Sequence, residues 1–241
     1  MRHAVVSDIH GNLEALSAVL ARIAPDDRVL SLGDIVGYGP DPNACVALVR
    51  ECASIAVLGN HDVGAIDNHA LDSFNPAARE AIAWTQGVLS SEHEAWLDGL
   101  AYEHREPAFL MVHGAPQNYF EYILDKEAAA RAFAATDAPL VFVGHTHIAE
   151  YYALRPDGAI AHEHRQHGGT LTLEAGTRYI VNVGSVGQPR DLNPEASFAF
   201  YEPDESRITW MRVPYPIART QDKIAQAELP ALLADRLSAG R

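Results

Sequence analysis

Residues 55–62 read IAVLGNHD, an apolar run followed directly by a glycine and three polar residues. The run 55–58 predicts a buried strand of a parallel sheet. The polar side chains would then lie at the carboxyl end of that strand, where open α/β sheets bind their ligands. Asn60 offers a carbonyl oxygen for a hard divalent ion, His61 a proton donor, and Asp62 a carboxylate that fixes the imidazole tautomer. Because short motifs also match by chance, this stretch alone fits a turn with a buried histidine as well.

Four further apolar runs have the same design. Each is followed closely by side chains that can ligate a metal: Asp8 and His10 after residues 4–6, Asp34 after 29–32, His113 after 109–112, and His145 and His147 after 140–143. Neighbouring parallel strands bring their carboxyl ends to one edge, so with Asn60 seven ligand-type side chains would share one cleft. Seven ligands suit two ions with one carboxylate between them, and Asp34, alone at its strand end, is the predicted bridge. Two ions about 3.5–4 Å apart lower the pKa of a shared water and hold both oxygens of an in-line displacement.

The rest of the chain predicts one domain, residues 1–241. A helical insertion at about 63–100 is expected to overhang the site, and a helix is expected at about 126–135. Beyond residue 150 the pattern predicts antiparallel strands at 151–154, 159–162, 170–173, 179–183, 197–201 and 208–212. The tail, about 217–241, predicts one or two helices whose leucine-rich face serves packing or self-association, so a homo-oligomer is possible.

Composition limits the classes of function. A chain of 241 residues can bury a sizeable core. The net charge of −14 argues against non-specific nucleic-acid binding, which needs a basic face. The two cysteines form no CxxC motif, which fits a reducing, cytoplasmic compartment. No apolar run approaches about 18 residues and Asp8 interrupts the apolar start, so we expect neither a membrane span nor a signal peptide.

Taken together, the motifs resemble those of the calcineurin-like metallophosphoesterases. The matching set, in the order of the family, is Asp8-x-His10, Gly33-Asp34, Gly59-Asn60-His61-Asp62, His113-Gly114 and Gly144-His145-x-His147. The loop 182–189 is similar to that of the bacterial phosphodiesterase branch, which extends the resemblance to about residue 202. The resemblance implies an α/β fold, a four-layer αββα sandwich of two mixed β-sheets.

The resemblance also implies a site. One ion would be held by Asp8, His10, Asp34 and His147, and the other by Asp34, Asn60, His113 and His145. A metal-bridging hydroxide would be the nucleophile, with His61 as acid or transition-state stabiliser oriented by Asp62. These ligands suit two divalent ions of Mn, Fe, Zn, Ni or Co, without distinguishing among them.

One departure bears on the substrate, expected to be a small phosphate ester or a nucleotide. Protein phosphatases of this superfamily, and the diadenosine tetraphosphatases similar to them, usually carry an arginine shortly after the Gly-Asp pair. Residues 33–39 contain none, which favours phosphodiesters. Arg190 is a candidate replacement cation, although a solvated loop arginine is an equal alternative, and Tyr38 is the best placed aromatic for substrate contact.

Other interpretations stay open. A phosphomonoesterase or a dinucleoside polyphosphate hydrolase is the alternative within enzymes. A non-catalytic scaffold, similar to the metallophosphoesterase-like subunit of retromer that lacks the catalytic histidine, is the alternative of another class, and the presence of His61 argues against it. Three further histidines, His162, His164 and His167, have irregular spacing and no cysteine nearby, so they are expected to be exposed loop residues.

Overall fold

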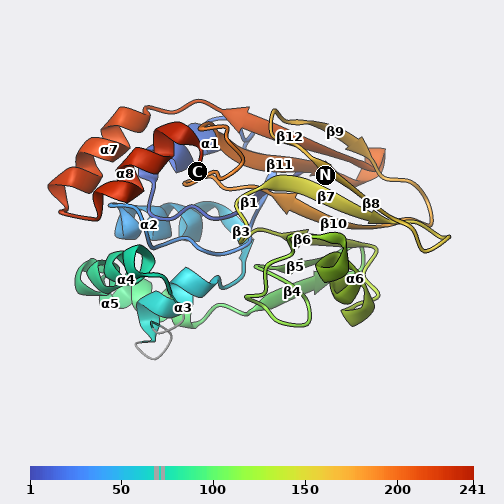
Figure 1. Cartoon of the computed structure of the whole chain (residues 1–241), viewed down its shortest axis with the longest axis horizontal. Coiled ribbons are helices and arrows are strands. Elements are labelled where there is room, and N and C mark those ends of the chain that lie inside the picture. Colours follow the sequence, from blue (N-terminus) through green and yellow to red (C-terminus); the bar gives the residue numbers. More distant parts are fainter. Residues whose placement is uncertain (68–70, 72–73) are drawn as a thin grey trace.

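Two six-stranded mixed sheets form the frame of the molecule (Figure 1). They are seen in a computed structural model, which describes residues 1–67, 71 and 74–241. The first sheet has the order β3 (Ala53–Ala56), β2 (Arg28–Ser31), β1 (His3–Val6), β11 (Ala196–Glu202), β12 (Arg207–Val213) and β9 (Gly169–Thr172). The second has the order β4 (Glu103–Glu106), β5 (Phe109–Val112), β6 (Leu140–Val143), β10 (Arg178–Val183), β7 (Ala149–Leu154) and β8 (Ile160–His164). All six strands predicted after residue 150 are found.

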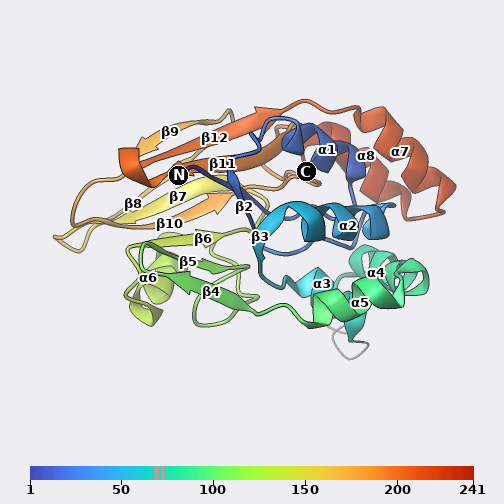
Figure 2. The same ribbon diagram turned by 180° about the vertical axis from the view of Figure 1, so that it is seen from behind.

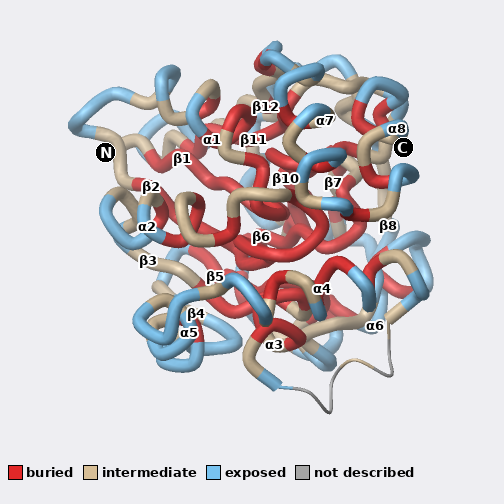
Figure 3. Tube along the Cα trace, turned by 90° about the vertical axis from the view of Figure 1, so that its left-hand side faces the viewer, coloured by how far each residue is buried: buried red, intermediate tan, exposed pale blue. Residues whose placement is uncertain are grey.

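Alternating side chains give each sheet two apolar faces. Val5 of β1 and Phe109 of β5 belong to the core between the two sheets. Val6 faces helices α1 (Leu13–Leu20) and α2 (Pro42–Cys52) on the outer side of the first sheet. Leu110 faces α6 (Lys126–Ala135) on the outer side of the second. The layers are therefore helix, sheet, sheet and helix, which confirms the predicted αββα sandwich, and Figure 3 shows the inner strands as its most buried part.

The remaining helices gather at one end of the molecule, as Figures 1 and 2 show from opposite sides. Between β3 and β4 the chain forms α3 (Asn60–Ile66), α4 (Pro76–Val88) and α5 (Ser91–Asp98). After β12 it forms α7 (Ile217–Gln226) and α8 (Ala231–Ala239), and a 3₁₀ turn, Pro203–Glu205, joins β11 to β12. The leucine-rich face of the tail packs against α4 and Tyr38 in one apolar cluster, so most of it is used inside this chain.

Two strands differ from the prediction. β3 ends at Ala56 and is a half-buried edge strand, and Val57 beyond it bonds to Ser31 of β2 and makes a separate bridge to Ala101. The buried part of the predicted strand is therefore its last two residues, which lead toward the polar stretch. β4, with the sequence EHRE, was not predicted, because an exposed edge strand needs no apolar face. No helix among the described residues is long and apolar enough to cross a membrane.

Candidate metal centre

Backbone hydrogen bonds join the loops that follow the parallel strands. The amide of Asp8, after β1, donates to the carbonyl of Gly33, after β2, at 3.1 Å. The amide of Gly144, after β6, donates to the carbonyl of His113, after β5, at 2.9 Å. The two sheets are connected by the amide of His145, which donates to the Asp8 carboxylate at 3.0 Å. Strand ends from both sheets thus meet at one place.

Six of the seven predicted ligands converge there in two groups that share Asp34. Asp8, His10, Asp34 and His147 form one group, and Asp34, His113 and His145 form the other, with the ligand atoms of each group within 4.8 Å of one another. Asp34 Oδ2 lies 3.3 Å from His113 Nε2 and 3.6 Å from His10 Nε2. Asn60 is one residue before His61, whose amide donates to Asp34 Oδ1 at 2.8 Å. The seventh ligand candidate is therefore beside the shared carboxylate.

Each of the four histidines is oriented by a backbone carbonyl. His10 Nδ1 bonds to Val36 at 3.1 Å, His113 Nδ1 to Leu32 at 2.8 Å, His147 Nδ1 to Gln188 at 2.6 Å, and His145 Nε2 to Phe120 at 2.9 Å. The carbonyl must accept, so the bonded nitrogen carries the proton and the other nitrogen faces the cluster. The free nitrogens of His10 and His147 are 3.1 Å apart, as are those of His113 and His145. Ligating histidines are normally fixed in this way.

Two buried oxygens of the predicted ligands test whether metal ions fit. Asp34 Oδ2 and Asn60 Oδ1 are buried, and neither has a hydrogen-bond partner among the described residues. Leaving such oxygens unpaired costs free energy, unless a group such as a cation satisfies them. Gly59 makes room for the arrangement, since a Cβ there would lie 2.1 Å from Asp34 Oδ1. Carboxylate, amide and imidazole donors around one shared oxygen fit a divalent metal site.

The backbone of the site is strained. The φ angles of Asp8, His10, Asp34, His145 and His147 lie between 51° and 68°, a region that residues with a side chain rarely adopt. Each such residue costs of order 1–3 kcal/mol, and such residues cluster at functional sites. The backbone conformation that directs these side chains into the site therefore lowers the stability of the fold.

Burial and charge set the protonation of the cluster. Burial opposes ionisation of Asp8 and Asp34, yet the neighbouring histidines keep the pKa of both carboxyls below the ordinary range. Burial and the charge of His113 lower the pKa of His145 to about 3. For His113 burial is outweighed by Asp34 and Asp8, which raise its pKa to about 9. A metal ion that binds His113 must displace this proton at neutral pH.

Comparison with known proteins identifies the family. The model of the calcineurin-like phosphoesterase superfamily domain matches residues 1–206. The chain belongs to this superfamily. It is 46% identical to a metallophosphoesterase of Sphaerobacter thermophilus of known structure, with a TM-score of 0.90 and coverage of 100% of this chain and 99% of that one. It is 37% identical to the uncharacterized protein MJ0912 of Methanocaldococcus jannaschii, over 99% of this chain and 98% of the relative. A shorter match, 37% over 99 residues, is to serine/threonine-protein phosphatase 1 of Salmonella typhimurium and covers 40% of this chain and 45% of that protein.

In this member of the superfamily, His61 is buried against the cluster. Its ring centroid lies 4.7 Å from that of His10, 4.3 Å from that of Tyr38 and 4.9 Å from that of Phe74. The contact with Phe74 brings the helical insertion to the site. Asp62 does not orient the ring as expected, because its carboxylate accepts from the backbone amides of residues 35, 36 and 59. Its contacts fix the loop that carries Asp34, and His61 Nδ1 has no hydrogen-bond partner among the described residues.

Arg190 and Tyr38 lie beside His61 on the wall of the site. Arg190 Nη2 donates to Tyr38 Oη at 3.2 Å and to Gln188 Oε1 at 2.9 Å, and its guanidinium lies 5.6 Å from the centre of the Tyr38 ring. Both acceptors are neutral, and none of the ion pairs among the described residues involves Arg190. Tyr38 is almost fully buried under the tail and insertion helices, which leaves little of its side chain for contact with a substrate.

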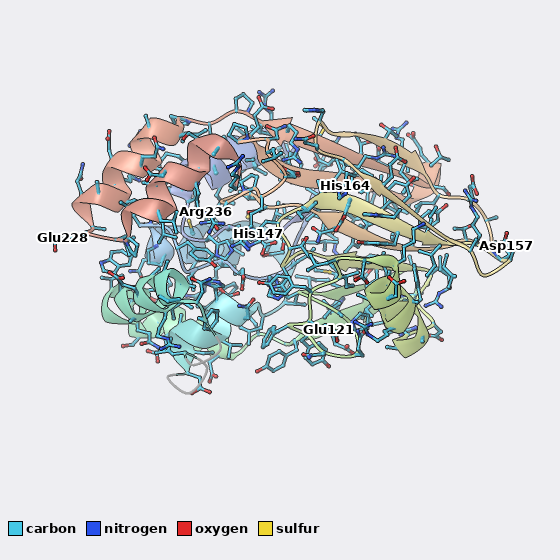
Figure 4. The ribbon with its side chains drawn as sticks, in the orientation of Figure 1. Glu121, His147, Asp157, His164, Glu228 and Arg236 are labelled. Atoms are coloured by element: carbon cyan, nitrogen blue, oxygen red, sulfur yellow. The ribbon has the colours of Figure 1, made fainter. Side chains whose placement is uncertain are left out.

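Beside the second group of ligands, Tyr122 stacks on His145 with ring centroids 3.9 Å apart and is 45% exposed. No pattern in the sequence pointed to this contact, because Tyr122 lies in a loop without regular spacing. Figure 4 shows His147 near the middle of the molecule, between the helical end and the sheets.

Proposed function

We propose that the protein is a dimetal phosphoesterase that hydrolyses phosphate esters, with phosphodiesters as preferred substrates. The observation that carries the proposal is the histidine arrangement. In each of the four rings, one nitrogen is hydrogen-bonded to a backbone carbonyl. The other nitrogen points into the group of ligands around Asp34, whose Oδ2 has no hydrogen-bond partner among the described residues. A cluster built only for stability would leave no such oxygen unpaired.

The ligand roles follow from the two groups of donor atoms. One ion would be held by Asp8, His10, Asp34 and His147, and the other by Asp34, Asn60, His113 and His145. When bound, such ions supply an activated water and neutralise charge on the phosphoryl oxygens. Mn, Fe, Zn, Ni and Co all suit these donors.

His61 would stabilise the transition state by a hydrogen bond. Burial lowers its pKa to about 4, and the positive charge of Arg190 acts in the same direction, so the ring is neutral at pH 7. A neutral imidazole still carries one N–H, which can donate to an oxygen that gains negative charge during the reaction. In this role His61 is a neutral hydrogen-bond donor, and not an imidazolium that is already protonated before the reaction.

Arg190 would bind a non-bridging phosphate oxygen, and Tyr38 would hold the guanidinium in position. Such a charge-assisted hydrogen bond is about twice as strong as a neutral one. The preference for diesters rests on the absence of arginine from residues 33–39. Arg190, and the partial match to a protein phosphatase, favour the alternative of a phosphomonoesterase or a dinucleoside polyphosphate hydrolase.

The deciding experiment compares hydrolysis of bis-p-nitrophenyl phosphate and p-nitrophenyl phosphate. Metal-stripped protein would be assayed after separate addition of Mn²⁺, Fe²⁺, Co²⁺, Ni²⁺ and Zn²⁺, with His61→Ala as the control for contaminating activity. Metal-dependent turnover with a higher kcat/KM for the diester is expected. A large preference for the monoester would reject the argument from the missing arginine.

Protein that binds two metal ions but hydrolyses neither ester, nor a dinucleoside polyphosphate, would instead support the scaffold alternative. A cytoplasmic location and self-association also stay predictions, the first from the cysteine usage. Size-exclusion chromatography with light scattering would measure the oligomeric state.

A further inference from the structure

The hairpin of β7 and β8 carries a second group of metal-type side chains. Glu150 of β7 is paired with His164 of β8, and Tyr152 is paired with His162. Residues two apart on a strand share one face, so all four side chains project from the same side of the hairpin. The sequence predicted exposed loop histidines here. His162 and His164 lie in a strand and not in a loop, although His164 is exposed as predicted, and the prediction holds for His167, which is exposed in the following turn.

The distances bring three donor atoms together. Glu150 Oε2 lies 2.7 Å from His162 Nε2 and 3.3 Å from His164 Nδ1, and the three atoms are within 4.8 Å of one another. The side chain of Glu150 is 3% exposed, that of His162 21% and that of His164 60%. One carboxylate and two imidazoles with an open side are the donors of three-ligand zinc sites, in which the fourth position stays free for water.

Neighbouring groups fix this arrangement. The ring of Tyr152 stacks on that of His162 with centroids 4.3 Å apart and an angle of 3°, which sets the direction of the imidazole. Asp191 lies close enough to Glu150 for its negative charge to raise the pKa of that carboxyl. Asp191 Oδ1 is buried without a hydrogen-bond partner among the described residues. Its other oxygen is paired with Arg212. Lys126, at the exposed start of α6, adds a positive charge that lowers the pKa of His162. A cation held by Glu150 would offset the repulsion between the two carboxylates.

We propose that Glu150, His162 and His164 form a third metal site that binds Zn²⁺, separate from the dimetal centre. Figure 4 shows His164 on β8 and His147 at a different place nearer the middle of the molecule. The two sites share no ligand, although Glu150 is only three residues after His147. The proposal does not depend on the proposed hydrolytic activity, because it rests on the hairpin alone.

The test is zinc binding by the full chain, measured by competition with a chromophoric chelator. Asp34→Asn provides the background, since it weakens the dimetal centre and leaves the hairpin untouched. In this background His164→Gln and His162→Gln should each weaken the remaining zinc on the order of 100-fold or more, because loss of an outer hydrogen-bond partner alone costs 10–100-fold. His167→Gln is the matched control and should bind as the background does.

Total zinc in the otherwise native protein gives a second measurement. After gel filtration, elemental analysis should find one more zinc per chain in the wild type and in His167→Gln than in His164→Gln. Equal zinc contents in the wild type and His164→Gln, with circular dichroism unchanged, would overturn the proposal. So would Asp34→Asn protein that holds no zinc at micromolar free metal.

Discussion

Replacing Gly37 by alanine should disable His61 without touching any metal ligand. A Cβ on Gly37 would lie 2.4 Å from Nδ1 of His61, 3.0 Å from its Cγ and 3.1 Å from its Cβ. Since non-bonded heavy atoms prefer about 3.5–4.0 Å, the imidazole must move by roughly 1 Å. The ring also packs against Tyr38 and Phe74, which limit where it can go, so the movement takes it away from its present position in the site.

The structure provides the magnitude and a matched control. A shift of about 1 Å at a catalytic group can cost on the order of 10²-fold in rate, and complete loss of a hydrogen-bond donor to the developing charge costs about 10²–10³-fold. Gly37 has a φ of +85°, so alanine there also costs roughly 1–2 kcal/mol of stability. Gly158 has a φ of +87° and open space around its Cβ position. Gly158→Ala therefore carries the same backbone cost without a displaced histidine.

The assay is a double-mutant cycle on metal-dependent ester hydrolysis. Gly37→Ala should lower kcat about 100-fold, with metal content unchanged, while Gly158→Ala keeps the activity of the wild type. In the His61→Ala background, Gly37→Ala should cost nothing further, which corresponds to a coupling of about 2.7 kcal/mol. Equal activity of the two glycine variants, or additive losses in the cycle, would refute the reasoning.

Three other perturbations test the site and its surroundings. Asp34→Asn should lose both metal ions, because Oδ2 faces His10 and His113 at 3.6 and 3.3 Å; metal analysis that still finds two ions would overturn the bridging role. Arg190→Met should lower kcat/KM by about 10–100-fold through loss of a hydrogen bond to a charged group, worth roughly 1.5–3 kcal/mol, with partial recovery in Arg190→Lys and unchanged metal content. An unchanged kcat/KM would make Arg190 a solvated loop residue. Burial and Asp191 raise the pKa of Glu150 from 4.5 to about 8, so metal-free protein should lose stability between those pH values, as the folded state resists ionising this carboxyl. Glu150→Gln removes that loss. In urea unfolding with a chelator present, the free energy of unfolding of the variant relative to the wild type should be higher at pH 8 than at pH 5 by up to a few kcal/mol. A difference that does not change with pH would contradict the shifted pKa.

Much of the fold follows from local patterns. A largely apolar run of three or four residues that is followed by glycine or a polar side chain is sufficient to place β1, β2, β5 and β6 and the candidate ligands after them. Helix α6 was also predictable, because its sequence is rich in alanine and Asp125 caps its first turn. These features depend on neighbours in the chain, so the sequence records them directly.

Three features depended on contacts between distant residues. The direction of the Asp62 carboxylate could not be predicted, because its hydrogen-bond partners include amides 26 and 27 residues away. β4 could not be predicted, because its polar residues become a strand only by pairing with β5. The group of Glu150 with His162 and His164 could not be predicted, because the register of β7 and β8 sets which side chains face each other.

The sequence by itself determined which residues carry the proposed chemistry of this protein and at which strand ends they lie. Alternation along a strand and the position of a strand end are local properties, so the seven ligand candidates follow from the order of the residues alone. Only the tertiary structure decided that these strand ends come from two different sheets and that Asp34 faces both groups of histidines. Those relations arise when the two sheets pack through their apolar faces. The distance between strand ends of different sheets depends on that packing, which no local pattern in the sequence encodes.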